Sequence, residues 1–352
     1  MSGSVFGKEF TISTFGESHG GAVGVIVDGV TPNIEISAEN IQKELNKRRP
    51  GQSKITTQRD ERDMVKILSG VYEGRTTGVP IMLVVFNKDA KSNAYDNIKD
   101  LFRPGHADYA YLQKYGIRDH RGSGRASGRE TIGRVAAGAI AKKILKEKYN
   151  IDITAYVVNV AGIKAQKIDY SEIENNIVRV ADKDVAEEIV AKITELMKQH
   201  DSTGGIIECN ITGVMPGIGE PTFDKLDADL AKAMLSIGAV KGIEFGAGFG
   251  VAEMSGSENN DWMDEGGFQT NNAGGIIGGI STGQDIVFRV PVKPTSSIAK
   301  PQPTVDINGE EVVCETFGRH DPIIAPRAVP VVEAMAAIVI LDHIKRQKAL
   351  HA

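Results

Sequence analysis

The stretch GRTTGVPIMLVVFNK at residues 74–88 has a counterpart, GISTGQDIVFRVPVK, at residues 279–293. A second pair, GVTP at 29–32 and GVMP at 213–216, precedes a predicted helix in each case. The offsets are 205 and 184 residues, so the second copy would carry 21 more, which we place in the Gly-, Asp- and Asn-rich stretch 244–272. The two pairs predict two similar β-α-β halves that share one core. The alternative is that Gly-x-Thr-Thr-Gly turns recur by chance.

Hydrophobic periodicity divides the chain into strands and helices. Short segments rich in β-branched residues predict strands at 23–27, 81–86, 153–160, 206–211 and 286–290. Apolar residues at helical spacing predict helices at 37–48, 129–147, 184–198 and 330–345. We expect three of these helices to open with Ser37, with an Asp184/Glu187 capping pair and with Pro330. Because no Pro- or Ser-rich linker interrupts the chain, residues 1–352 are predicted to form a single α+β domain.

Charge is unevenly distributed along the sequence. The formal net charge of -5 argues against nucleic acid as the main partner, because phosphate backbones bind to broad basic surfaces. Eleven of the sixteen arginines nevertheless lie between Arg48 and Arg134. Guanidinium groups match carboxylates and phosphates, so this pattern suits a small polyanionic ligand held in one cleft.

Membrane and metal-binding classes are disfavoured. No apolar run is long enough to span a bilayer, and residues 1–10 lack a basic segment followed by an apolar stretch. The expectation is therefore a cytoplasmic protein without a membrane partner. Cys209 and Cys314 belong neither to a CxxC pair nor to a Cys/His cluster with metal spacing, so we expect two reduced, buried cysteines and no bound metal.

Two motifs each contain a histidine in a glycine-containing turn. FGESHGG at 15–21 places His19 between glycines at the start of a strand, where its titration range suits proton transfer. RPGHAD at 103–108 combines an arginine fork, a Pro-Gly turn and His106. Taken singly, each is also compatible with a structural loop histidine or a surface turn.

Three further motifs predict anion binding. RDHRGSGRASGRET at 118–131 supplies four arginines and a Gly/Ser turn just before a helix, where backbone N–H groups bind phosphate. It is neither a Walker motif nor a dinucleotide fingerprint, because the Gly-Lys-Ser/Thr end is absent and the third glycine is misplaced. KPTSS at 293–297 and GRHDP at 318–322 add hydroxyl and charged groups, although loop punctuation and mutual ion pairing are the alternatives.

In order and spacing, the five motifs resemble the chorismate synthase family. The matching patterns are GESHGxxxGxxxDGxxP from Gly16 to Pro32, RPGHADY from Arg103, RxSxRET from Arg125, KPTSS and GRHDP. The resemblance implies a β-α-β sandwich core and a homotetramer. It also implies an anti-1,4 elimination of phosphate from 5-enolpyruvylshikimate 3-phosphate, giving chorismate with the help of reduced FMN and no net oxidation.

The resemblance further implies roles for individual residues. His19 would protonate the departing phosphate, His106 would govern the charge of the reduced flavin, and Asp321 would assist proton acceptance. The implied substrate contacts are Ser18, Arg48, Lys54, Arg103 and Arg129. The implied flavin contacts are Arg125, Ala126, Ser127, Gly238, Ala239, Gly278, Lys293, Pro294, Thr295, Ser296, Ser297 and Arg319.

The sequence departs from the family pattern at two positions. Ala126 and Gly128 stand where most members carry Ser and Ala, which removes a hydroxyl and leaves backbone contacts possible. An FMN- or NAD(P)H-dependent oxidoreductase is the competing interpretation, but no dinucleotide fingerprint is present. We therefore expect an external flavin reductase to supply the reduced FMN. A non-catalytic anion-binding protein is the third possibility, which requires both histidines to lie away from the cleft.

Overall fold

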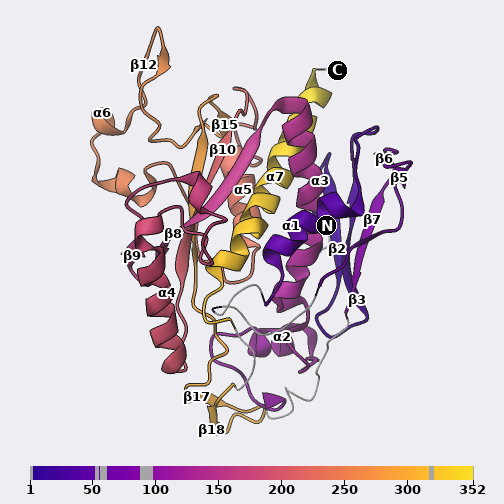
Figure 1. Cartoon of the computed structure of the whole chain (residues 1–352), viewed down its shortest axis with the longest axis vertical. Helices are drawn as coiled ribbons and strands as arrows, with labels where there is room; N and C mark the ends of the chain where they lie inside the picture. Colours follow the sequence, from indigo (N-terminus) through magenta and orange to yellow (C-terminus); the bar gives the residue numbers. More distant parts are fainter. Residues whose placement is uncertain (1–2, 52–54, 56–61, 88–97, 317–320, 352) are drawn as a thin grey trace.

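Three layers make up the protein, with helices sandwiched between two five-stranded antiparallel sheets (Figure 1). The computed structural model describes residues 3–51, 55, 62–87, 98–316 and 321–351. Each sheet turns one face toward the helices and buries its β-branched side chains there. The predicted β-α-β sandwich is confirmed.

The first sheet and its helices come from the N-terminal half. The sheet has the order β1 (Val5–Phe6), β2 (Thr11–Gly16), β3 (Ala22–Asp28), β7 (Ile81–Phe86) and β4 (Lys66–Ile67). A small hairpin, β5 (Val71–Tyr72) and β6 (Arg75–Thr76), precedes β7. The helices of this half are α1 (Ala38–Arg48), the short α2 (Asp108–Tyr115) and α3 (Thr131–Tyr149), and α3 packs on β2, β3 and β7.

The second sheet repeats this plan. Its order is β11 (Glu244–Phe245), β16 (Ile286–Val292), β10 (Gly205–Thr212), β8 (Asp152–Val160) and β9 (Ile163–Lys164). The hairpin β14 (Ile276–Ile277) and β15 (Ile280–Ser281) precedes β16. The inner helices are α5 (Leu226–Leu235) and α7 (Ala325–Leu350), and α7 packs on β8 and β10.

The turns of the two halves agree hydrogen bond by hydrogen bond. In the first half Thr76 Oγ1 donates to the carbonyl of Thr31 at 2.7 Å and accepts from the amide of Ile34 at 2.9 Å. In the second half Ser281 Oγ donates to the carbonyl of Met215 at 2.7 Å and accepts from the amide of Ile218 at 2.9 Å. These pairs keep the sequence offsets of 205 and 184 residues. The repeat is therefore structural rather than a chance recurrence of turns.

The two halves meet along α3 and α7. A β-carbon added at Gly138 would lie 2.3 Å from the β-carbon of Ala334, so the helices approach more closely than any larger pair of residues permits. Beside this contact Lys142 Nζ donates to Glu333 Oε2 at 2.6 Å and to Glu44 Oε2 at 2.9 Å. Because Glu333 also accepts the amide of Ala155 at 3.0 Å, one ion cluster ties α1, α3, α7 and β8 together.

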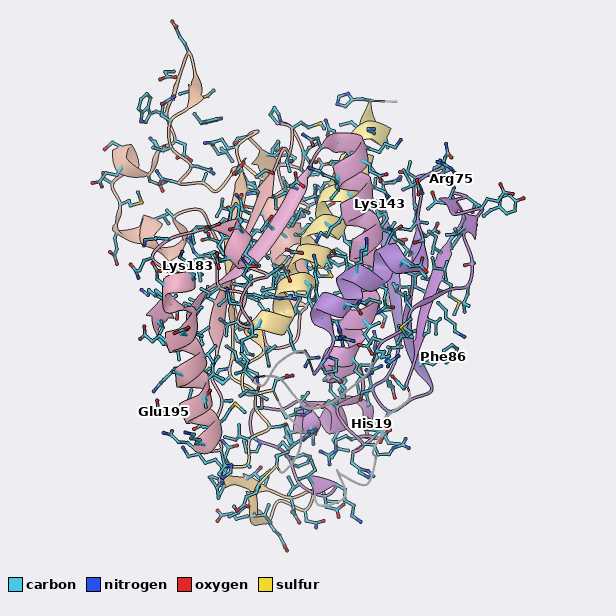
Figure 2. All side chains as sticks on the ribbon, viewed as in Figure 1. His19, Arg75, Phe86, Lys143, Lys183 and Glu195 are labelled. Carbon is cyan, nitrogen blue, oxygen red and sulfur yellow. The ribbon has the colours of Figure 1, made fainter. Side chains whose placement is uncertain are left out.

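The remaining elements lie outside the sandwich. Helix α4 (Lys183–Lys198) flanks the second sheet, with Lys183 and Glu195 pointing outward (Figure 2). The expected insertion forms an arm that contains α6 (Gly256–Asn259) and the hairpin β12 (Met263–Asp264) and β13 (Gly267–Phe268). The hairpin β17 (Gln302–Val305) and β18 (Glu311–Cys314) lies near α2, at the end of the molecule away from that arm (Figure 1).

Three predicted helix starts are corrected by the structure. The last helix begins at Ala325 rather than Pro330, because Pro326 is the proline of its first turn and Pro330 lies within the helix. Helix α4 is capped by Asp182, whose side chain accepts from the amide of Asp184. Helix α3 begins at Thr131 rather than residue 129, after a 3₁₀ turn. Within the described part of the chain, no helix combines the length and apolar character that crossing a membrane requires.

Candidate active site

A cavity of about 610 Å³ lies where the central helices of both halves begin. Thr131 at the start of α3 and Arg327 at the start of α7 both line it, as do residues 236–239, which follow α5. Helix N-termini carry partial positive charge, so two of them directed at one cavity favour an anion there.

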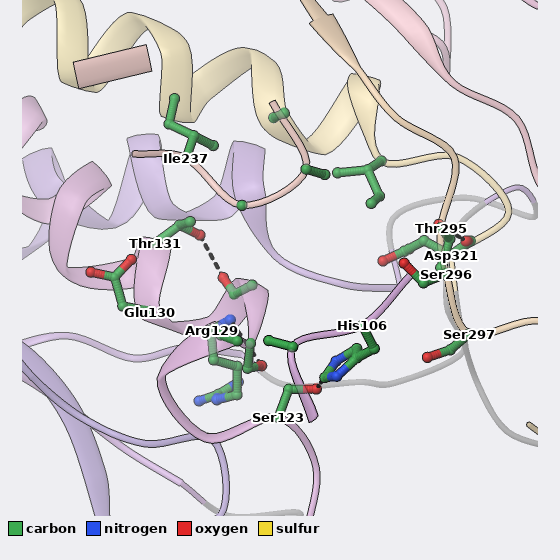
Figure 3. A pocket seen from close by; sticks show the side chains of 18 of the residues that line it. His106, Ser123, Arg129, Glu130, Thr131, Ile237, Thr295, Ser296, Ser297 and Asp321 are labelled. Carbon is green, nitrogen blue, oxygen red and sulfur yellow. Dashed lines mark hydrogen bonds between the residues drawn. The ribbon is translucent and has the colours of Figure 1, made fainter. Parts of the chain in front are cut away.

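His106 is held on both sides within this cavity. Its Nδ1 lies 3.0 Å from Oδ1 of the buried Asp108, and its Nε2 lies 2.9 Å from Oγ of Ser123 (Figure 3). Asp108 also accepts from Arg103 Nε at 2.7 Å. Burial opposes ionisation of Asp108, yet hydrogen bonds from Arg103 and His106 hold the pKa of its carboxyl below the usual range. The carboxylate therefore fixes the orientation of the imidazole at position 106.

The turn that carries His106 is supported by the KPTSS loop. Lys293 Nζ and Ser296 Oγ donate to the carbonyl of Gly105, at 2.6 Å and 2.8 Å. The β17–β18 hairpin adds a second support, since the amide of Phe102 donates to the carbonyl of Val305 at 3.1 Å. The RPGHAD and KPTSS motifs thus form one wall of the cavity. They are 190 residues apart in the sequence, counted from Arg103 to Lys293.

His19 lies directly behind that wall. Its Nδ1 is 3.1 Å from Oγ of the buried Ser18, and a β-carbon added at Gly122 would fall 2.4 Å from the imidazole. Gly122 is the neighbour of Ser123, which contacts His106, so the two histidines lie on either side of one short segment. The sequence motifs around residues 19 and 106 therefore converge.

Two arginines share one buried carboxylate. Asp63 Oδ2 accepts from Arg48 at 2.9 Å, and its Oδ1 accepts from Arg129 at 3.0 Å. Burial raises the pKa of Asp63 and lowers the pKa of Arg48, because both charged groups have lost water. Arg48 is 2% exposed, and its Nε has no hydrogen-bond partner among the residues that the structure describes. Asp63 therefore holds the guanidinium groups of Arg48 and Arg129 side by side at the edge of the cavity, where an anionic ligand could accept hydrogen bonds from them.

Asp321 and Arg327 form a second ion pair at the cavity. Arg327 also donates from Nε to the carbonyl of Arg48 at 3.2 Å, which connects α7 to the end of α1. The carbonyl of Asp321 accepts from Thr295 Oγ1 at 2.6 Å. These contacts place the aspartate of the GRHDP motif beside the KPTSS loop.

Most predicted site residues line the cavity. They are Arg48, Arg103, His106, Arg125, Ala126, Ser127, Arg129, Gly238, Ala239, Lys293, Thr295, Ser296, Ser297 and Asp321. Ser18 and His19 lie behind the wall, and Pro294 is not among the lining residues. Gly278 lies in the turn between β14 and β15, and it is not among the lining residues of this chain either. Lys54 and Arg319 lie outside the described residues.

Two of the four clustered arginines have structural contacts instead. Arg118 lies 3.3 Å from Asp108 and stacks over Phe102, whereas Arg121 pairs with Asp119 at the surface. Arg125 and Arg129 do line the cavity. The four arginines do not face one ligand because the segment contains two 3₁₀ turns before α3 and so changes direction.

Sequence reasoning missed several residues around the cavity. Arg327 and Arg134 line it, and Asp63 and Asn87 lie behind it. Arg327 was overlooked because the last helix was expected to begin at Pro330, which left residue 327 in a loop. The available signal was Pro326, a proline suited to the first turn of a helix, directly followed by Arg327. Asp63 and Asn87 carry no motif, and only the fold brings them to the arginines.

The cavity has two chemically different sides. Ile237, Ile324 and Val331 supply an apolar side, while the His106 turn and the segment 125–129 supply hydrogen-bond donors and positive charge. A flavin has an apolar dimethylbenzene edge, a polar pyrimidine edge and a phosphate tail. Arg48, with its buried Nε unpaired among described residues, adds a site for a charged group. The lining therefore fits a flavin together with a polyanionic substrate.

Comparisons with known proteins agree with this geometry. A family model described as chorismate synthase matches residues 10–345. Proteins named chorismate synthase from Methanococcoides burtonii and Roseiflexus castenholzii are both 53% identical to this chain. The two alignments cover 100% and 99% of this chain, respectively, and 98% of each relative. A crystal structure of chorismate synthase superposes with a TM-score of 0.77 at 31% identity, covering 97% of this chain and 93% of that one.

Proposed function

Since the chain belongs to the chorismate synthase family of carbon-oxygen lyases, we propose that this cavity eliminates phosphate from 5-enolpyruvylshikimate 3-phosphate to give chorismate. In the reaction the C3–O bond breaks to release phosphate, a C6–H bond breaks, and a second ring double bond forms. The family requires a flavin. We propose reduced FMN, which when bound supplies an electron transiently and recovers it, so that no net oxidation occurs.

The observation that carries this proposal is the convergence of buried guanidinium groups, helix N-termini and His106 on one cavity. The substrate has two carboxylates and a phosphate, and bidentate guanidinium contacts suit both groups. Arg48 and Arg129 are the proposed clamp, because both are buried, both line the cavity and both are held by Asp63. Arg103 is occupied by Asp108, so we propose that it mainly orients His106 rather than binding substrate.

The two histidines are proposed to handle protons. His106, held by Asp108 at Nδ1, would contact the reduced flavin and govern the charge of its ring. His19 does not line the cavity, and the resemblance alone proposes it as the proton donor to the departing phosphate. Asp321 would assist hydrogen removal from C6, with Arg327 orienting its carboxyl group. Lys54 and Arg319 remain proposed ligands through the resemblance.

The remaining proposals concern the whole enzyme. We propose a homotetramer in the cytoplasm that receives reduced FMN from a separate reductase. Gly278 would then contact flavin only in the assembled enzyme, since it does not line the cavity of its own chain. These proposals are supported by the family resemblance, and the absence of a dinucleotide fingerprint supports the separate reductase.

Phosphate release under anaerobic conditions tests the proposed function. Wild-type protein is mixed with 5-enolpyruvylshikimate 3-phosphate and photoreduced FMN, and chorismate is followed by its absorbance. Turnover is expected with reduced FMN and none with oxidised FMN, and His106→Ala should lose most of the rate while remaining folded. Failure to release phosphate with reduced FMN would overturn the function, and rapid NADPH-dependent bleaching of bound FMN would overturn the external reductase.

A further inference from the structure

Arg129 is held at both ends of its guanidinium group. Its NH1 donates to Asp63 at 3.0 Å, and its Nε donates to Oδ1 of Asn87 at 2.9 Å. The arginine is 6% exposed and lines the cavity. These two contacts come from different segments, residue 63 before β4 and residue 87 directly after β7.

The other end of Asn87 holds the loop that carries His19. Asn87 Nδ2 donates to the carbonyl of Glu17 at 2.9 Å and to the carbonyl of Gly20 at 2.7 Å. Its backbone amide donates to the carbonyl of Gly21 at 3.1 Å. One side chain thus accepts from the cavity arginine and donates on both sides of His19.

The internal repeat indicates that the amide of Asn87 is not required by the fold. At the offset of 205 residues, the counterpart of Asn87 is Val292. Val292 pairs with Gly205 in the second sheet, just as Asn87 donates its backbone amide to the carbonyl of Gly21 in the first half. Val292 is 3% exposed and belongs to the hydrophobic core. The same strand end therefore accepts an apolar residue in the second half, so the asparagine serves a need specific to the first half.

We propose that Asn87 is a positioning residue, which ties Arg129 of the anion clamp to the His19 loop so that substrate phosphate and the proton donor keep a fixed relation. The inference rests on the proposed function of His19 and Arg129. A side chain that must accept from a guanidinium and donate to two carbonyls has to be an amide, because a carboxylate cannot donate and an ammonium cannot accept. Asparagine meets both requirements at this distance from the backbone.

Asn87→Asp separates the two functions of this side chain. The variant keeps the acceptor for Arg129 but places a carboxylate oxygen against two carbonyls, which should displace the His19 loop. We expect kcat to fall about 100-fold, as a misplacement of about 1 Å can cause, with KM nearly unchanged. The matched control is Asn46→Asp on the exposed side of α1, which keeps its acceptor for Gln42 and should retain wild-type kinetics.

A double-mutant cycle tests whether Asn87 acts through His19. If it does, adding Asn87→Asp to His19→Ala should cost no further activity, within about twofold. A general structural defect would lower the rate of the double variant below that of His19→Ala. If Asn87→Asp does not fold, Asn87→Val copies the second half and should both lower kcat and raise KM.

The outcomes separate this inference from the function it rests on. Wild-type protein that releases no phosphate would overturn the proposed function. An active wild type combined with an unchanged kcat in Asn87→Asp, or with additive losses in the double variant, would overturn the role of Asn87 alone. A rise in KM of Asn87→Asp without loss of kcat would also overturn it, because the residue would then serve only the clamp.

Discussion

His106 and Asp108 are joined by a hydrogen bond of 3.0 Å between Nδ1 and Oδ1, and the carboxylate is 5% exposed. The bond orients the imidazole. We predict that Asp108→Asn lowers kcat by about 100-fold, because the amide no longer offers a carboxylate oxygen pair to Arg103 and His106 and so misplaces the imidazole. Steady-state chorismate formation checks this. Asp100→Asn, at an exposed carboxylate, is the control, and equal rates in the two variants would contradict the role of Asp108.

The same carboxylate predicts how stability depends on pH. The pKa of Asp108 is lowered in the folded protein, so its contribution is fully present above the unfolded value of about 3.9 and is lost as pH falls toward the lower folded value. Urea unfolding should therefore show a larger gap between wild type and Asp108→Asn at pH 7 than at pH 3. A gap that stays constant over this range would show that the carboxylate contributes through shape alone.

Gly122→Ala should displace His19. The added β-carbon would lie 2.4 Å from the imidazole and 2.9 Å from Ser18 Oγ, and the residue has a left-handed φ of 71°. We expect kcat to fall about 100-fold with the fold retained, measured by phosphate release and circular dichroism. Gly124→Ala is the matched control, since its φ is 49° and its β-carbon would meet nothing within 4 Å. Similar losses in both variants would assign the effect to backbone strain.

Asp63→Asn should weaken the anion clamp. Asparagine tolerates the φ of 47° at this position, but it removes the charge that holds Arg48 and Arg129 side by side. We expect KM for the substrate to rise about tenfold, equivalent to about 1.4 kcal/mol, with a smaller change in kcat. Glu73→Gln, an exposed residue with a φ of 46°, is the control. An unchanged KM would contradict this prediction, because it would show that Arg48 and Arg129 keep their positions without the charge of Asp63.

The fold was predictable from the sequence wherever local pattern and tertiary structure agree. All five predicted strands are present because their β-branched runs are buried, and the repeated turns keep the same hydrogen bonds in both halves. Helix starts were less predictable. Both Pro326 and Pro330 suit a helix beginning, and only packing of Ala328 and Val329 in the core selects the earlier one.

Candidate site residues were easiest to predict where they lie in short motifs. Glycine and proline mark the turns that carry His19, His106 and Lys293, and the structure brings these turns close together, while their roles stay predictions. Asp63 and Asn87 could not be found in this way. An isolated Asp or Asn has many uses in a loop, and its function here depends on neighbours that the fold brings from distant segments.

The close contact between Gly138 and Ala334 affects how the cavity can select one orientation of its ligand. It sets α3 and α7 side by side, and both begin at the cavity, so the main chain alone would present two nearly interchangeable positive poles to any ligand. A ring with a phosphate on one carbon and a hydrogen to lose on another must enter in a single orientation. We therefore propose that side chains that differ between the repeats discriminate its two ends, with Arg129 and Arg134 around one pole and Arg327 and Val331 around the other.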